Sequence, residues 1–230
     1  MQDVCYDCGK ELDDSNRTKE HVPAKNLYDG FGHEFKKNRI TVPACFECNN
    51  RYSKIDQEIR DLLAVKSNNL NEKAELTGKG IRSIFRQKNW KGRVFTDING
   101  NAVSVSFDYN QLCNLHLKNF KALFFKKYGF PLPTDFELAI ATEGDEGKIE
   151  NIEKIHNYIR DGKEWEVSGS ADVFKFIIKD ITFDPINGYY ESGDINKLDS
   201  IGGVIVYHDE IVAVILASKK MFIESCKPKD

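Results

Sequence analysis

The chain has 230 residues, of which 40% are hydrophobic and 30% charged, and its formal net charge is -3. A chain of this length can bury a core without cross-links, and this composition excludes a disordered or fibrous protein. The sequence has no apolar stretch long enough to span a membrane, and its start lacks the basic and hydrophobic segments of a signal peptide. We therefore expect a globular cytoplasmic protein with no membrane partner.

Charge is distributed unevenly along the chain. Residues 1–130 carry 22 Lys and Arg against 16 Asp and Glu, whereas residues 131–230 carry 11 against 20. Because Lys and Arg contact phosphates, a polyanion would meet the first part more readily than the second. The positive excess is modest for 130 residues, so charge alone only weakly favours nucleic acid as a partner.

In the first half of the chain, the predicted elements are a loop-rich segment followed by helices. Residues 1–53 are rich in turn formers and have little helical periodicity, with one short apolar run at 40–43. From Tyr52 onward, apolar residues recur at helical spacing, which predicts an amphipathic helix that ends near residues 67–69. Residues 72–88 are a second helical candidate, weakened by two glycines.

The second half of the sequence predicts a mixture of strands and helices. Asn99-Gly100 stands between two β-prone runs, 93–96 and 102–107, and predicts a hairpin. Residues 110–128 predict a helix with an apolar face, which ends at the segment 129–133. The last hundred residues predict an α+β unit with a strand at 136–142, a helix at 149–160, and strands within 173–181 and 204–216, with a turn near 208–210.

Four of the six cysteines form two pairs with metal-ligand spacing. Cys5-x2-Cys8 and Cys45-x2-Cys48 are separated by 36 residues. Four thiolates form the tetrahedral soft-ligand set that zinc prefers, and disulfides are not expected in a reducing compartment. One structural Zn²⁺ would join the beginning and end of the loop-rich segment, although four unpaired buried cysteines are the alternative. The two isolated cysteines are expected to pack in cores: Cys113 and Cys226.

Two further segments are attached to the same cysteine pairs. Thr18-Lys19-Glu20-His21-Val22-Pro23-Ala24 lies inside the loop that zinc would close, and Asn49-Asn50-Arg51 follows the fourth cysteine directly. This arrangement resembles the HNH endonucleases, in the zinc-containing branch written C-x2-C, (D/E)-H-(V/I)-x-P, C-x2-C-(H/N), over about residues 5–60. The resemblance implies a ββα-metal module that cleaves DNA, and an effector of a bacterial or phage defence system.

The resemblance also assigns roles to three residues. It makes Glu20 a ligand of a catalytic Mg²⁺ or Mn²⁺, Asn49 a second ligand, and His21 the general base. Such hard cations prefer oxygen ligands, and a neutral histidine can take a proton from water while the cation stabilises charge on the phosphate. Because neighbours on a regular strand point to opposite sides, we expect the chain to bend near Pro23 so that both Glu20 and His21 can serve one site.

Two positions depart from the family pattern. Ile40 stands where the middle asparagine of the motif is expected, and Asn38, two residues earlier, is our candidate for orienting the histidine. One turn after Asn49 the family often has a histidine, whereas this chain has Ser53. Asp56 shares that helical face and could be a third cation ligand, although an acid early in a helix can also serve only the helix dipole.

Other candidates have weaker support. Four cations flank the proposed site and could hold phosphates, or could simply form a solvated surface: Lys36, Lys37, Arg39 and Arg51. His33 is expected to be an exposed loop residue. His116 lies on the apolar face of a predicted helix, which favours a core histidine satisfied by hydrogen bonds.

Two functions are compatible with these patterns. The first is an endonuclease acting on DNA, with RNA not excluded, and the second is a non-catalytic zinc-knuckle module that binds nucleic acid or protein. The Glu-His pair together with Cys-x2-Cys-Asn favours the nuclease, because a structural knuckle does not need oxygen ligands beside a histidine.

The expected fold class is α+β. We expect a nuclease module in residues 1–70 and an α+β accessory domain in 71–230, with a boundary near 130 as an alternative. The acidic part of the chain could select substrate, form a homo-oligomer or bind a protein partner.

Overall fold

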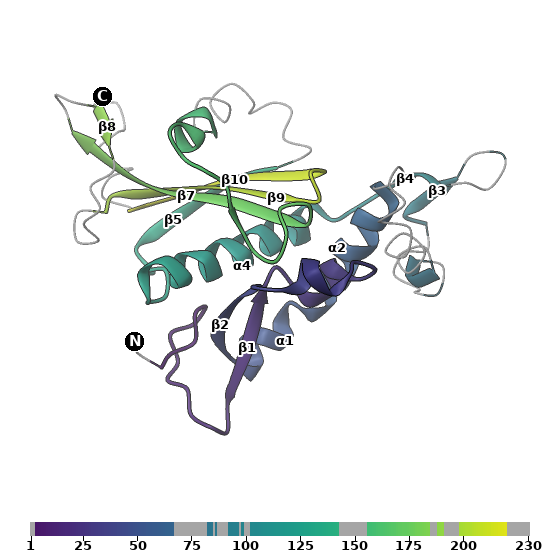
Figure 1. Cartoon of the computed structure of the whole chain (residues 1–230), viewed down its shortest axis with the longest axis horizontal. Coiled ribbons are helices and arrows are strands. Elements are labelled where there is room, and N and C mark those ends of the chain that lie inside the picture. The colour runs from purple at the N-terminus through teal and green to yellow at the C-terminus, as the bar shows by residue number, and fades with distance from the viewer. Residues whose placement is uncertain are drawn as a thin grey trace.

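The computed structural model describes residues 3–66, 82–84, 86, 92–96, 98, 102–142, 156–184, 188–190 and 198–219. Over these residues the chain is mixed α+β, as the sequence predicts (Figure 1). None of the helices in the described ranges has the length and apolarity needed to cross a bilayer. Three predicted features lie outside the described residues: most of the helix at 72–88, the Asn99-Gly100 turn and Cys226.

The N-terminal part consists of a β-hairpin followed directly by two helices. Strands β1 (Arg17–Val22) and β2 (Ile40–Cys45) are antiparallel, with Arg17 opposite Cys45 and Val22 opposite Ile40. Their connection contains two 3₁₀ turns, η1 (Lys25–Tyr28) and η2 (His33–Lys36). Strand β2 runs into α1 (Phe46–Arg51), and α2 (Ser53–Lys66) comes next. This is a ββα order, and α2 agrees with the helix predicted from residue 52.

The central element is α4 (Tyr109–Tyr128), which agrees with the helix predicted at 110–128. It begins at Asp108, whose carboxylate accepts a hydrogen bond from Asn110 N at 2.9 Å. It ends at Gly129, whose φ of 82° is the left-handed conformation common at helix C-termini. Before α4, the strands β3 (Val94–Thr96) and β4 (Ala102–Val105) pair as the sequence predicts.

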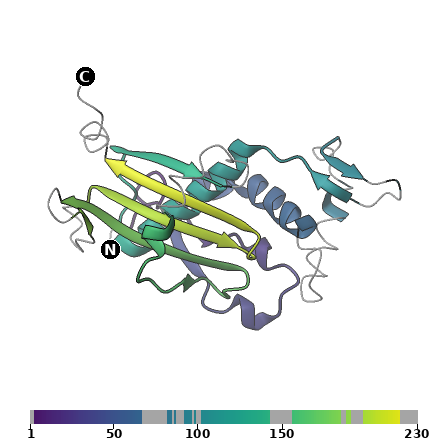
Figure 2. The same cartoon turned by 90° about the horizontal axis from the view of Figure 1, so that it is seen from above.

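The C-terminal part forms one antiparallel sheet in the order β5-β10-β9-β7-β6 (Figure 2). Its strands are β5 (Phe136–Ala141), β6 (Glu166–Val167), β7 (Phe174–Asp184), β9 (Ser200–Tyr207) and β10 (Ile211–Lys219), and β8 (Gly188–Tyr190) pairs with β7. The predicted strands at 136–142, 173–181 and 204–216 are confirmed, including the turn at 208–210. Of the predicted helix at 149–160, residues 156–160 are described and helical.

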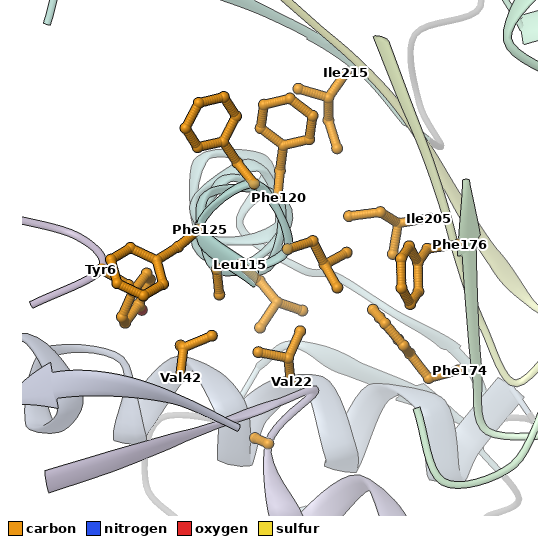
Figure 3. Close-up of a cluster of buried hydrophobic side chains, with 14 of the residues drawn as sticks. Tyr6, Val22, Val42, Leu115, Phe120, Phe125, Phe174, Phe176, Ile205 and Ile215 are labelled. Atoms are coloured by element: carbon orange, nitrogen blue, oxygen red, sulfur yellow. The ribbon is translucent and has the colours of Figure 1, made fainter. Parts of the chain in front are cut away.

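Helix α4 lies between the sheet and the N-terminal hairpin (Figure 1). Figure 3 shows Val22 and Val42 on one side of α4, and Phe174, Phe176 and Ile205 on the other. Burying an apolar side chain of this size contributes about 1.5–3 kcal/mol, so both contacts of α4 hold the molecule together. Because α4 is covered on both sides, three of its polar residues are buried as well: His116, Lys118 and Asn119.

A second connection joins the hairpin to the sheet. Ser168, directly after β6, donates its hydroxyl to Val22 O and accepts a hydrogen bond from Ile40 N at 2.8 Å. Val22 and Ile40 are the pair of the hairpin next to the connecting segment, so Ser168 bridges the two strands where that connection begins and ends. At Gly169, with φ of 72°, an added Cβ would lie 2.5 Å from Phe35 O, so only glycine allows this close approach.

Candidate active site and metal centre

The four paired cysteines converge on one point. Their Sγ atoms all lie within 4.8 Å of one another, and Cys8 Sγ is 3.9 Å from Cys45 Sγ. A tetrahedral zinc ion with Zn–S bonds of about 2.3 Å would separate its sulfurs by about 3.8 Å. The four sulfurs can therefore hold a metal ion such as zinc, as the spacing predicts, whereas Cys113 lies apart from them on α4.

Local structure explains why these cysteines meet. Cys45 ends β2 and Cys48 lies in the first turn of α1, where its backbone N donates to Cys45 Sγ at 3.4 Å. The loop that carries Cys5 and Cys8 is fixed to β2 by a hydrogen bond from Tyr6 N to Pro43 O at 2.9 Å. The hairpin therefore brings both pairs to the same end of the N-terminal part.

Asp7, between the first two cysteines, joins this cluster to α4. Its carboxylate is buried and lies 2.9 Å from Lys121 Nζ and 3.3 Å from Arg51 Nη1. Arg51 also donates to Cys48 Sγ at 3.6 Å. Arg51 was a candidate phosphate contact, but these bonds direct its guanidinium toward the cysteine cluster.

Beside the cluster lies an open cleft of about 310 Å³. It brings together four of the residues predicted for the catalytic site: Glu20, His21, Asn49 and Asp56. The remaining lining residues are Lys19, Ala24, Lys25, Asn26, Asn50 and Ser53. Strand β2 ends at Cys45 and runs directly into α1, and β1 pairs with β2, so the side chains of β1 and α1 that line the cleft are held beside each other.

His21 lies on β1 and is partly exposed to the cleft. Burial lowers its pKa to about 4, and the positive charges of Lys25 and Arg39 act in the same direction. The imidazole is therefore neutral at pH 7 and able to accept a proton. Strand β1 is regular through Glu20 and His21 and ends at Val22, and the chain bends at Pro23, so both residues line the cleft although the bend comes after them.

Glu20 points to the buried side of β1, toward α4, and is only 3% exposed. Its Oε1 lies 3.1 Å from Lys118 Nζ and accepts a hydrogen bond from His21 N at 3.2 Å. Its Oε2 is buried and has no hydrogen-bond partner among the described residues. Burial raises the pKa of Glu20, while the charge of Lys118 opposes that shift.

Asp56, on α2, binds the same lysine. Lys118 Nζ lies 2.9 Å from Asp56 Oδ1 and 2.7 Å from Oδ2. Burial raises the pKa of Asp56 and Lys118 opposes the shift. The side chain of Lys118 is completely buried, and its ammonium lies 5.6 Å from the centre of the Tyr52 ring. The structure thus places Asp56 in a buried ion pair, which neither sequence alternative for this residue foresaw.

Asn49 lies on α1, half-buried at the edge of the cleft. Its Nδ2 donates to Thr18 Oγ1 at 3.1 Å, and Thr18 in turn donates to Ala44 O at 3.0 Å. This bond fixes the side-chain amide with its nitrogen toward β1. The carbonyl oxygen Oδ1 is the atom of Asn49 that suits a hard cation.

The other predicted residues lie at the margin. Asn38 is exposed in the turn before β2, with φ of 55°, and is not among the residues that line the cleft in the described part of the chain. Lys36 and Lys37, at the end of η2, are also outside the lining. The guanidinium of Arg39 lies 5.3 Å from the centre of the Tyr28 ring. His33 is exposed, as expected.

Sequence reasoning missed Lys19, Lys25 and Lys118. Lys118 had a recognisable signal, because it stands three residues after Leu115 and four before Ala122, in the apolar stripe of α4. A lysine at such a position is buried only with a charged partner. Lys19 directly precedes the Glu20-His21 pair, whereas the position of Lys25 depends on the connection between β1 and β2.

His116 is a core histidine, as predicted. Its Nδ1 lies 3.3 Å from Tyr207 Oη, and its Nε2 lies 3.1 Å from Thr142 Oγ1. Burial lowers its pKa to about 3, so it is neutral in the folded protein. His116 is held between α4 and the sheet and takes no part in the cleft.

The cleft combines three kinds of polar group. It holds a neutral imidazole, a buried carboxylate oxygen without a hydrogen-bond partner among the described residues, and two lysines at its border. The four-sulfur cluster next to the cleft is compatible with a zinc-stapled module, in which β1, β2 and α1 follow one another in the chain. Comparison of the chain with protein-family models, with curated proteins and with solved structures gave no match.

Proposed function

We propose that this protein is a metal-dependent endonuclease that hydrolyses DNA phosphodiester bonds. His21 is the general base, and Glu20 and Asn49 are ligands of a single Mg²⁺ or Mn²⁺. The observation that carries the proposal is the convergence of these three residues on one cleft, from β1 and from α1. We also propose that the four-cysteine cluster holds a structural zinc, which keeps β1 and α1 in this arrangement.

The residues around Glu20 fit a hard cation. A buried carboxylate oxygen without a hydrogen-bond partner is unfavourable, and Glu20 Oε2 is such an atom among the described residues. A cation at this oxygen would remove that cost, and the Asn49 carbonyl is a second oxygen donor in the same cleft. When bound, the cation supplies charge stabilisation at the phosphate and at the leaving oxygen.

The protein's own side chains account for the other steps. Neutral His21 accepts the proton of the attacking water, because its lowered pKa keeps a ring nitrogen unprotonated. Lys19 and Lys25 line the cleft and would attract phosphates without reading base sequence. Burial is the main reason that His21 stays neutral, and the positive charge of Lys25 adds to it.

Cleavage assays with His21→Ala test the proposal. Purified protein is incubated with plasmid and with single-stranded oligonucleotides in Mg²⁺ or Mn²⁺, with EDTA as the metal-free control. We expect cleavage that falls by about 10²–10⁴-fold in His21→Ala, the usual contribution of a general base. His33→Ala is the matched control, because His33 is exposed outside the cleft, and it should cleave normally. Cleavage that survives His21→Ala would contradict the assigned mechanism.

The second candidate function is a non-catalytic zinc-knuckle module that binds nucleic acid or protein. The observation in its favour is Lys118, whose ammonium already pairs with both carboxylates of the site. In that case Glu20 and Asp56 serve the fold, and nucleic acid would bind through Lys19 and Lys25 without a divalent cation. Fluorescence anisotropy with labelled oligonucleotides in EDTA tests this: binding that weakens in Lys19→Ala and Lys25→Ala, with no cleavage in any metal, would favour the binding module.

We propose that residues beyond 70 act as an accessory domain of the nuclease, within a bacterial or phage defence system. The acidic composition of residues 131–230 suits a protein partner or a second copy of the chain rather than DNA. Activity that rises more steeply than protein concentration would support a homo-oligomer as the active form. Activity strictly proportional to concentration, in the absence of partners, would argue against that part of the proposal.

A further inference from the structure

Lys118 is a buried charged group that contacts two residues of the cleft, and the proposed chemistry does not use it. It reaches the site from α4, whereas Glu20 belongs to β1 and Asp56 to α2. Removing an ammonium group from water costs several kcal/mol unless its charge and its hydrogens find partners. Here the partners are complete, because Nζ has three carboxylate oxygens within 3.1 Å.

Lys118 contacts both carboxylate oxygens of Asp56 but only one of Glu20. Both oxygens of Asp56 and Oε1 of Glu20 contact the ammonium, which has three hydrogens to donate. The oxygen left over is Glu20 Oε2, which is buried, without a partner among the described residues, and belongs to a residue that lines the cleft. Lys118 contacts the other three oxygens of the two carboxylates, so its position determines which one remains without a partner among the described residues.

The same three groups determine the charge immediately around Glu20 Oε2. With both carboxyls ionised, Glu20 and Asp56 contribute two negative charges and Lys118 one positive charge, so these three groups together have a net charge of one negative unit before a cation binds, while Lys19 and Lys25 add positive charge at the border of the cleft. Attraction for a divalent cation depends on that net charge, and the dependence is strong in a partly buried site.

We propose that the buried ammonium of Lys118 is a permanent part of the metal site. It positions Glu20 Oε2 for the divalent ion, and its positive charge lowers the affinity of the site for that ion. Asp56 is then the anchor of Lys118 and not a metal ligand. Lys118 is a positioning residue, because it acts through the two carboxylates and touches neither substrate nor metal. This inference rests on the proposed function, since it assumes that a divalent cation binds at Glu20.

The alternative arrangement is direct competition. If Asp56 were a ligand, the metal ion and the ammonium would need the same two oxygens, and Lys118 would have to leave when metal binds. The two arrangements predict different effects of removing Asp56 and Lys118 together. If Asp56 only anchors Lys118, its loss no longer affects metal affinity once Lys118 has been replaced. If Asp56 is a metal ligand, its loss lowers metal affinity with or without Lys118.

The test is Mn²⁺ titration calorimetry of the full-length zinc-loaded protein without nucleic acid. Three isosteric variants change the site charge in steps: Asp56→Asn makes it neutral, Lys118→Met makes it two negative units, and Asp56→Asn with Lys118→Met restores one negative unit. We expect Mn²⁺ affinity to fall by about tenfold or more in Asp56→Asn, to rise by a similar factor in Lys118→Met, and to return to within about threefold of wild type in the double variant. Glu20→Gln, which removes the ligand, should abolish binding at this site.

The double variant decides the matter even if Lys118→Met does not fold. It replaces a buried ion pair by neutral groups of similar size, a change that proteins often tolerate, and circular dichroism verifies its fold. If Mn²⁺ affinity stays about tenfold or more below wild type in the double variant, Asp56 is a ligand and the inference is overturned. Unchanged affinity in a folded Lys118→Met would also overturn it.

The calorimetry separates this inference from the proposed function. The expected affinity steps in a protein that cleaves no nucleic acid would support the role of Lys118 and contradict the nuclease. Cleavage that depends on His21, together with a double variant that has lost Mn²⁺ affinity, would support the nuclease and contradict the role of Lys118.

Discussion

The ammonium nitrogen of Lys118 lies 2.7 Å from Oδ2 of Asp56, although the two residues are 62 positions apart in the chain. Through the same nitrogen, Lys118 also reaches Glu20 Oε1 at 3.1 Å. One residue of α4 thus joins β1 and α2 at the border of the cleft. The N-terminal residues that resemble an HNH motif therefore depend on a residue outside the motif for their charge balance.

The buried Lys118–Asp56 pair predicts a non-additive effect on stability. Lys118→Met leaves two buried carboxylates without their counter-ion and should lower the free energy of unfolding by about 3–5 kcal/mol. Adding Asp56→Asn should recover a large part of this loss, because one of the uncompensated charges is removed. Urea unfolding followed by tryptophan fluorescence measures both variants. A double variant less stable than Lys118→Met alone would show that the pair is not the reason for the loss.

The cysteine cluster predicts one zinc ion per chain. Cys48→Ser removes a buried sulfur from the four-sulfur set and should reduce zinc content to well below one per chain, with a lower melting temperature, because metal binding contributes to folding. Elemental analysis by mass spectrometry and a thermal melt give both quantities. Cys113→Ser, on α4 and apart from the cluster, is the matched control and should keep its zinc. Full zinc content in Cys48→Ser would contradict the proposed ligand set.

Two asparagines that the sequence proposed for the site are expected to differ in importance. Asn49 lines the cleft and is oriented by Thr18, whereas Asn38 is exposed in the turn before β2. Asn49→Ala should therefore weaken Mn²⁺ binding and slow DNA cleavage by about tenfold or more, comparable to the loss of a group that orients or ligates a catalytic metal. Asn38→Ala should change neither Mn²⁺ affinity nor the cleavage rate by more than about twofold, because Asn38 is not among the residues that line the cleft in the described part of the chain. Equal losses in the two variants would show that the turn closes on the cleft when substrate binds.

Burial of neutral His116 predicts a loss of stability in mild acid. Its pKa falls from 6.5 to about 3 on folding, so the unfolded chain takes up the proton first as the pH drops. The stability contribution is complete above pH 6.5 and is lost progressively from pH 6.5 toward pH 3, by about 2 kcal/mol between pH 7.5 and pH 5. In the described part of the chain, the hydrogen-bond partners of the ring are the hydroxyls of Tyr207 and Thr142, and burial is the cause of its lowered pKa.

Urea unfolding at pH 7.5 and pH 5 measures this effect. His116→Gln cannot titrate, so its stability should fall by about 2 kcal/mol less than that of wild type over the same interval. His33→Gln, at an exposed position, should behave as wild type. An identical pH dependence in wild type and His116→Gln would rule out His116 as the source.

Much of the fold could be predicted from the sequence because the signals are local. The apolar spacing from residue 52 and over 110–128 determined α2 and α4, since a helical face results from a period of 3.6 residues. The spacing of Cys5, Cys8, Cys45 and Cys48 determined the four-sulfur cluster, because each Cys-x2-Cys pair already places two sulfurs in one turn. The core position of His116 was predicted by the same helical periodicity.

The tertiary structure decided the charges around the cleft. The partnership of Lys118 with Glu20 and Asp56 exists only because α4 packs between the hairpin and the sheet. Arg51, expected to flank the site, pairs with Asp7, while Lys25 reaches the cleft through the connection between β1 and β2. Periodicity and spacing specify what lies on one element, but an ion pair between elements depends on how those elements pack, and no local pattern contains that information.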